Sequence, residues 1–210
     1  MSTCVFPDDA IYPLSPDQIH NGEPHSTNLG YGFSKRMLEV QSRAYRRQYG
    51  CNFVNIVPNN LFGEYDNFHL VESHVIPSVI RKIYEAKKSE KPSVTLWGSG
   101  NPMREFTYSG DLAKIIVFMM SNYDGAAPIN VGNPGEHTIK ELAESIKQIL
   151  GYDGAIIWDT TEPDGQFRKP SSNDKFLEYK WPDTYVDFHE GLKKTCEWFT
   201  KNYPNVRGVN

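Results

Sequence analysis

The sequence has few cysteines, and those it has show no pairing pattern. Cys4, Cys51 and Cys196 are odd in number, and no CxxC occurs. The six histidines form no HExxH motif and no Cys/His array with metal-ligand spacing. We therefore expect reduced thiols, as in a cytoplasmic protein, and no bound metal.

Long apolar runs and basic runs are also missing. No stretch approaches the roughly 18–20 apolar residues that span a bilayer, and no basic region precedes an apolar core at the N-terminus. Lys and Arg total 22 against 26 Asp and Glu, for a net charge of −4. Because no basic stretch is interleaved with aromatic residues, we expect neither a membrane nor a nucleic-acid partner.

A third absence concerns glycine. No GxGxxG or GxxGxxG motif lies between a strand and a helix, where such glycines let a backbone approach a pyrophosphate. The stretch "GSGNPMREF" contains two glycines but precedes no clear phosphate-binding helix. The chain also begins without a preceding strand.

The segments that are present alternate between strand and helix patterns, which indicates an α/β fold with mostly parallel pairing. Thr138 and Glu141 form a capping box, and Gly50 and Gly151 are natural helix ends. The spacing predicts helices over 29–49, 74–88, 109–123, 138–150 and 187–202, and strands over 51–57, 93–97, 128–132 and 155–159. Residues 59–68 are expected to form a loop.

The pattern changes character near residue 60. We expect residues 1–60 to be part of an incomplete Rossmann-type lobe, doubly wound and mostly parallel, without its first strands. We expect residues 61–210 to form mainly a smaller α/β substrate-binding lobe, with some segments returning to the sheet lobe.

Tyr31 and Lys35 lie four residues apart on the expected helix 29–49 and therefore share one face. A nearby ammonium favours the phenolate and lowers the pKa of a tyrosine. A serine hydroxyl can bind the same carbonyl oxygen as the phenol, and Ser2 precedes Tyr31 by 29 residues. Together the three groups could polarise a carbonyl for hydride delivery. YxxxK alone is weak, because a Tyr packed at a helix edge beside a solvated Lys has the same spacing.

Longer stretches carry a more specific resemblance. They are "STCVFP", "NLGYGFSKRM", "QYGCNFVNIVPNNLFGEYDNF", "SHVIPSVIRK", "VTLWGSGNPMREFTYSGDLA", "INVG" and "EPDGQFRK". The chain resembles the extended short-chain dehydrogenase/reductase family, and within it the branch that converts GDP-4-keto-6-deoxymannose to GDP-L-fucose. The resemblance implies 3,5-epimerisation followed by NADPH-dependent 4-keto reduction. It also implies a cytoplasmic homodimer formed through the Tyr-Lys helix.

The resemblance also implies roles for individual residues. Tyr31, Lys35 and Ser2 match the reductase set. Cys4 and His74 match the epimerisation pair, and both residue types can exchange protons near neutral pH. Which of the two is base and which is acid stays open.

Binding positions carry over in the same way. Arg104 suits a diphosphate clamp because a guanidinium binds phosphate bidentately, and Trp97 could pack on the guanine. The cofactor positions implied are Lys35, Pro58, Asn59, Asn60, Leu61 and His74. The substrate positions implied are Lys82, Trp97, Arg104 and Asp164.

The missing glycine-rich loop is the main departure from the family pattern. We expect the chain to be a truncated form of such an enzyme. One alternative is a non-catalytic truncated subunit that dimerises with the full-length enzyme. Another is a different nucleotide-sugar epimerase or dehydratase of the same fold. A dehydratase would place Asp-Glu after its catalytic Thr, whereas Thr3 and Cys4 follow Ser2 here.

Overall fold

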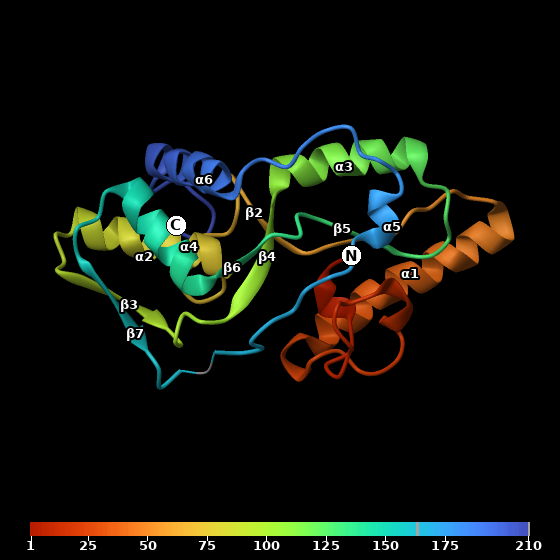
Figure 1. The fold of residues 1–210 in the computed structure, drawn as a ribbon, viewed down its shortest axis with the longest axis horizontal. Coiled ribbons are helices and arrows are strands. Elements are labelled where there is room, and N and C mark those ends of the chain that lie inside the picture. The colour runs from red at the N-terminus through yellow and green to blue at the C-terminus, as the bar shows by residue number, and fades with distance from the viewer. Residues whose placement is uncertain (163, 210) are drawn as a thin grey trace. The chain divides into compact units, whose positions relative to one another are not determined.

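The computed structural model describes residues 1–162 and 164–209. The chain forms two compact units, each built from three segments (Figure 1). The first unit comprises Met1–Leu61, Glu105–Gly135 and Lys169–Tyr185, and the second comprises Phe62–Arg104, Glu136–Arg168 and Val186–Asn210. The chain therefore leaves the first unit after residue 61 and returns to it twice.

In the first unit, three short 3-10 helices precede one long helix. They are η1 (Thr3–Val5), η2 (Pro16–Gln18) and η3 (Ser26–Asn28), and α1 (Leu29–Tyr49) follows them. Gly50 ends α1 in the left-handed conformation, with φ 69°, as the sequence predicted. Strand β1 (Ile56–Pro58) pairs in parallel with β5 (Ile129–Val131), with Ile56 opposite Ile129.

The expected strand over 51–57 is wrong in its extent. The Phe53 N–H donates to the carbonyl of Cys51 at 3.1 Å, so the chain turns there before it pairs. Only Ile56–Pro58 forms the strand. The apolar run predicted the pairing but could not reveal the turn.

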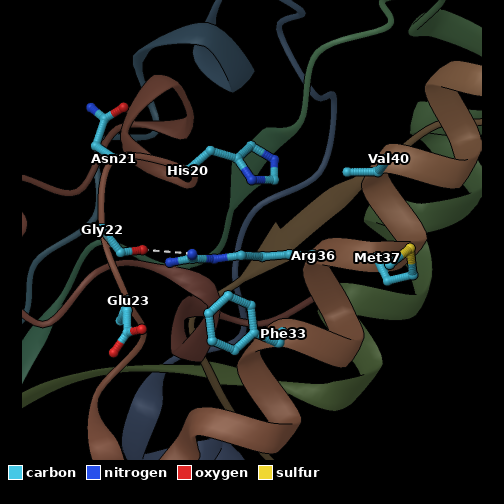
Figure 2. Close-up of a pocket in the computed structure, with 8 residues that line it drawn as sticks. All are labelled: His20, Asn21, Gly22, Glu23, Phe33, Arg36, Met37 and Val40. Carbon is cyan, nitrogen blue, oxygen red and sulfur yellow. Dashed lines mark hydrogen bonds between the residues drawn. The ribbon is translucent and has the colours of Figure 1, made fainter.

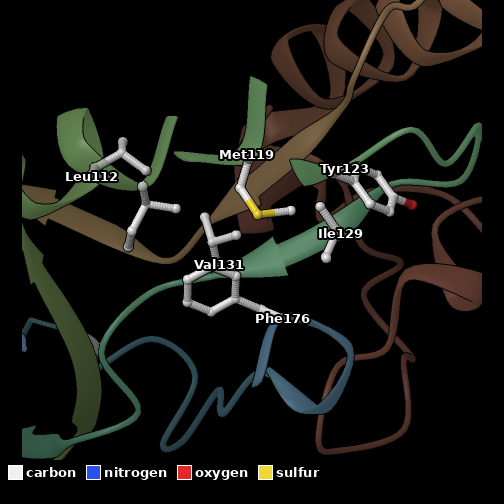
Figure 3. Close-up of a cluster of buried hydrophobic side chains, with 7 residues drawn as sticks. Leu112, Met119, Tyr123, Ile129, Val131 and Phe176 are labelled. Carbon is white, nitrogen blue, oxygen red and sulfur yellow. The ribbon is translucent and has the colours of Figure 1, made fainter. Parts of the chain in front are cut away.

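The core of the first unit lies between helix α3 (Ser109–Asn122), strand β5 and helix α5 (Asp174–Leu177). Figure 3 shows Leu112 and Met119 of α3 packed with Ile129 and Val131 of β5, and Phe176 of α5 closes the cluster. In a second cluster, Val57 of β1 packs with four residues of the N-terminal segment, Val5, Phe6, Leu14 and Ile19. These two clusters hold α3, β1 and η1 as one body.

In the second unit, helices α2 (Val75–Lys88), α4 (Ile139–Leu150) and α6 (Phe188–Asn202) pack together, with α4 contacting both of the others. Strands β3 (Ser93–Trp97) and β7 (Ala155–Asp159) pair in parallel over five residues each. Both parallel pairs and the helix order confirm the predicted α/β class.

A three-stranded sheet has the order β2–β4–β6, formed by Asn60–Phe62, Met103–Tyr108 and Glu136–Thr138. The expected loop over 59–68 is therefore wrong at β2. Three residues are too short for a period-two pattern to be seen, and β2 owes its conformation to a strand more than 40 residues away. Across residues 1–162 and 164–209, no helix has the length and apolar character that crossing a membrane requires.

The capping box of α4 gives the first prediction. The Glu141 carboxylate accepts the Thr138 N–H at 2.8 Å, and hydrogen bonds with Thr138 lower the pKa of Glu141 from its ordinary 4.5. The stabilisation is thus present above pH 4.5 and is lost as the pH falls through the lower folded pKa. Glu141→Ala should reduce the free energy of unfolding by about 0.5–1 kcal/mol at neutral pH, and by less near pH ~3.

Denaturant unfolding at the two pH values measures the difference. Glu144→Ala, on the same helix but outside the box, is the matched control. An equal loss at both pH values would contradict this account of the cap.

Candidate active site

The segment with Ser2 and Cys4 packs directly on the beginning of α1. Ser2 is the N-cap of η1, and its Oγ accepts the Cys4 N–H at 3.4 Å. A Cβ at Gly32 would lie 2.9 Å from the Cys4 carbonyl oxygen and 2.7 Å from the Pro24 side chain. Only glycine permits this approach, so a glycine on α1 sets how close η1 comes to the helix.

Tyr31 and Lys35 occupy one face of the same helix, as their spacing predicted. The Lys35 Nζ lies 5.5 Å from the centroid of the Tyr31 ring. Tyr31 is 47% exposed, so its phenol is open to a ligand. The Lys35 charge lowers the pKa of the Met1 amino group, after the larger effect of burial. The ammonium is therefore close to the residue that precedes Ser2.

Two charged residues that were not singled out in the sequence make the second attachment of this segment to α1. Arg36 is buried and donates to the carbonyls of Val5 at 2.7 Å and Gly22 at 2.6 Å. Glu39, also buried, binds His20 Nε2 at 2.8 Å and Arg43 Nε at 2.6 Å. No sequence pattern marks the two Arg36 bonds, because both acceptors are backbone carbonyls, whereas Glu39 and Arg43 have the i,i+4 spacing of a helical pair.

An open hollow of about 480 Å³ lies beside this attachment. Figure 2 shows Phe33, Met37 and Val40 of α1 on one side and residues 20–23 on the other, with Arg36 reaching across to Gly22. Three apolar side chains of α1 thus face residues 20–23 across the hollow.

The expected cofactor residues 58–61 run from the end of β1 into β2, with Asn59 between the two strands. The buried Asn59 side chain accepts a hydrogen bond from Thr107 Oγ1 at 2.6 Å and donates to the Asn133 carbonyl at 2.9 Å. Asn60 is exposed, and its Nδ2 donates to the carbonyl of Glu105 at 2.9 Å. The Asn59 side chain thus fixes the link between the two strands, whereas Pro58 is buried and Leu61 packs toward the core.

In the second unit, Lys82 and Trp97 are brought together. The Lys82 Nζ lies 5.1 Å from the centroid of the Trp97 ring, a cation–π contact. Burial lowers the pKa of Lys82, while 59% of Trp97 is exposed at the end of β3. An aromatic face beside a cation is suited to a base and its phosphates.

Asp164 and Arg104 belong to the same region as Trp97. The Asp164 carboxylate accepts the Ser99 N–H at 2.6 Å and the Ser99 Oγ–H at 2.7 Å, and these bonds lower its pKa. Gly98, with φ +79°, allows the approach, because a Cβ there would lie 2.4 Å from Asp164 Oδ1. Arg104 Nη1 donates to the Met103 carbonyl at 2.8 Å. A Cβ on Gly165 would lie 3.9 Å from Arg104 Nη2, so the guanidinium lies beside this loop.

Ser99 is a residue that sequence reasoning missed. Its signal was the pair of glycines around it, Gly98 and Gly100, which both have positive φ. The "GSG" stretch is therefore the turn whose serine donates two hydrogen bonds to the Asp164 carboxylate.

His74 is the exposed N-cap of α2. Burial raises the pKa of Asp66, and the Asn67 N–H, His74 and Arg207 partly offset this rise. His74 thus lies within electrostatic range of a half-buried carboxyl. Cys4 belongs to the first unit and His74 to the second.

The contact at Gly32 gives the second prediction. Gly32→Ala should destabilise the chain by about 1–3 kcal/mol, because its Cβ would press on the Cys4 backbone and on Pro24. Gly30 is two residues away on α1 and has nothing within 4 Å of its Cβ position. Gly30→Ala should therefore be neutral, or stabilising by up to about 1 kcal/mol. Thermal or denaturant unfolding compares the two variants, and equal effects would show that η1 does not rest on Gly32.

Residues 1–132 match the model of the NAD dependent epimerase/dehydratase family. The chain is 42% identical over 210 residues to GDP-L-fucose synthase of Dictyostelium discoideum, covering 99% of this chain and 65% of the relative. It is 34% identical over 216 residues to GDP-L-fucose synthase of Escherichia coli K12, covering 99% and 67%.

Solved structures agree with the predicted fold. The crystal structure of a GDP-L-fucose synthetase from Naegleria fowleri bound to NADP superposes with a TM-score of 0.95 at 37% identity, covering 99% of this chain and 66% of that one. This chain spans 61–67% of the length of the curated relatives it matches.

Proposed function

The chain belongs to the NAD-dependent epimerase/dehydratase family, and on that premise we propose that it carries the catalytic and sugar-nucleotide-binding residues of a GDP-L-fucose synthase. The proposed reaction converts GDP-4-keto-6-deoxymannose to GDP-L-fucose by 3,5-epimerisation and then 4-keto reduction. The observation that carries the proposal is the packing of η1 on α1, which places the segment of Ser2 and Cys4 beside the helix of Tyr31 and Lys35. The identity to GDP-L-fucose synthases supports it.

For the reduction, Tyr31 gives a proton to the oxygen at C4, and Ser2 donates a hydrogen bond to the same oxygen. Lys35, 5.5 Å above the phenol ring, stabilises the phenolate that remains and binds a ribose hydroxyl. NADPH supplies the hydride when it is bound. The exposed phenol, the ammonium and the 58–61 segment fit its nicotinamide and ribose end. The sequence holds no glycine-rich loop for its pyrophosphate.

For the epimerisation, the protons at C3 and C5 are acidic because both carbons flank the ketone. Cys4 and His74 form the proposed acid–base pair. One removes a proton to leave an enolate, and the other returns a proton to the opposite face. A thiol and an imidazole can both exchange protons near neutral pH.

For substrate binding, Trp97 packs on the guanine, and Lys82 and Arg104 neutralise the diphosphate. Asp164 closes the turn at Ser99 and so fixes the loop that reaches Arg104. All four residues belong to the second unit, whose role we propose to be substrate binding, and the first unit provides the reductase residues.

We also place the active protein in the cytoplasm as a homodimer formed through α1. The free thiols of Cys4, Cys51 and Cys196 support the compartment. The exposed apolar side chains of α1, among them Met37, Leu38 and Tyr45, support the dimer. The same surface favours a second candidate function, a non-catalytic subunit that pairs with a longer copy of the enzyme.

The third prediction tests the reductase role. Tyr31→Phe should lower NADPH oxidation with GDP-4-keto-6-deoxymannose by about 10²–10⁴-fold, because the proton donor is lost. Tyr49→Phe, an exposed phenol at the last residue of the same helix, should leave the rate unchanged. Full activity in Tyr31→Phe would overturn the proposed role. A folded chain that neither binds nor oxidises NADPH would favour the non-catalytic subunit.

The fourth prediction tests the diphosphate clamp. Arg104→Met should weaken GDP binding by about tenfold or more, through loss of charge-assisted hydrogen bonds. Guanosine, which lacks the diphosphate, should bind the variant and the unsubstituted chain alike. Quenching of tryptophan fluorescence reports both titrations, and Lys193→Met, an exposed cation of the second unit, is the control. Unchanged GDP affinity in Arg104→Met would exclude the clamp.

A further inference from the structure

Arg36 is a buried charge that the proposed chemistry does not use. It follows Lys35 on α1 and is only 5% exposed. Its Nε donates to the carbonyl of Val5 at 2.7 Å, and its Nη1 donates to the carbonyl of Gly22 at 2.6 Å. One side chain therefore ties two distant points of the N-terminal segment to the helix.

The attachment to Val5 controls where Ser2 and Cys4 lie. Val5 ends η1, and its N–H donates to the Ser2 carbonyl at 3.1 Å. Cys4 lies between these two residues, and its own N–H donates to the Ser2 Oγ. A shift of the Val5 carbonyl would move the whole turn. The contact of the Cys4 carbonyl with Gly32 restrains the turn on its other side.

A guanidinium is suited to this task and costs free energy to bury. Burial lowers the pKa of Arg36, and Nη2 has no hydrogen-bond partner among the described residues. The nearby carboxylate of Glu39 binds His20 and Arg43. The planar fork reaches two carbonyls at once, which the single ammonium of a lysine cannot do with the same geometry.

We propose that Arg36 is a positioning residue, which holds η1, and with it Ser2 and Cys4, in register with Tyr31 and Lys35. This inference rests on the proposed function, in which Ser2, Cys4 and Tyr31 act on one sugar and Lys35 stabilises the Tyr31 phenolate. A misplacement of about 1 Å at such a site can cost about 10²-fold in rate. The hydrogen bonds of Arg36 go to backbone carbonyls and not to these four side chains, so it acts through the backbone of η1.

Alkylation of the three cysteines by iodoacetamide, followed peptide by peptide by mass spectrometry, tests the attachment directly. Arg36→Met should raise the labelling rate of Cys4 about tenfold, because the turn opens more often without its two charged hydrogen bonds. Arg36→Lys should raise it less. Cys51, beyond the far end of α1, and Cys196, buried in α6, should keep their rates and serve as internal controls.

Arg47→Met is the matched control, because Arg47 is exposed on the same helix, and it should leave all three rates unchanged. An unchanged Cys4 rate in folded Arg36→Met would overturn the proposal. An equal rise in the labelling rates of all three cysteines in both Arg36 variants would overturn it as well. Arg36 would then stabilise the whole chain and would not hold η1 in particular.

Turnover of GDP-4-keto-6-deoxymannose gives the second readout. Arg36→Met should lower kcat by about 10²-fold with little change in KM, because the groups that move are reacting groups and not those that bind GDP. An unchanged kcat would overturn the positioning role. If the unsubstituted chain showed no turnover, the proposed function would fail, and the thiol labelling would still decide whether Arg36 holds η1.

Discussion

The close approach of the Cys4 backbone to Gly32 is the contact on which the first unit depends. A methyl group at position 32 would lie 2.9 Å from the Cys4 carbonyl oxygen, so the spacing of η1 and α1 is fixed by the absence of a side chain. Arg36, four residues after Gly32 on α1, also holds η1 by its hydrogen bond to the carbonyl of Val5. Ser2 and Cys4 are thus set against the helix that carries Tyr31 and Lys35.

This attachment gives α1 an unusual distribution of side chains. Its buried residues are Gly32, Arg36 and Glu39. The buried positions of the face that meets the N-terminal loops therefore carry charged side chains and a glycine, and no apolar side chain. Apolar and aromatic side chains on its flanks are exposed, including Phe33 at 45% and Met37 at 54%. Helices normally bury their apolar stripe. An exposed apolar surface of this kind marks an interaction site, which agrees with the proposal that α1 joins two subunits.

Local patterns in the sequence predicted most of the helices and their ends. Thr138 and Glu141 cap α4, Gly50 and Gly151 end helices in the left-handed conformation, and Tyr31 meets Lys35 because a helix brings residues four apart together. Features that depend on distant residues were not predictable. Asn59 is held by Thr107, 48 residues away, and β2 is a strand only because β4 pairs with it. The spacing of Phe33, Met37 and Val40 predicted the helix, but not that its polar side would be the buried one.

The central claim is that the Cys4 segment on α1 is catalytic and not merely packed there. Incorporation of deuterium from D₂O into C3 and C5 of GDP-4-keto-6-deoxymannose tests it without requiring hydride transfer. Nuclear magnetic resonance of the recovered sugar nucleotide would measure the exchange. We expect deuterium at C3 and C5 together with inversion of both centres for the unsubstituted chain, and loss of the inversion in Cys4→Ser, while Cys51→Ser behaves as the unsubstituted chain does. A folded chain that binds GDP yet exchanges neither proton, or a Cys4→Ser variant that inverts both centres at the full rate, would contradict the account.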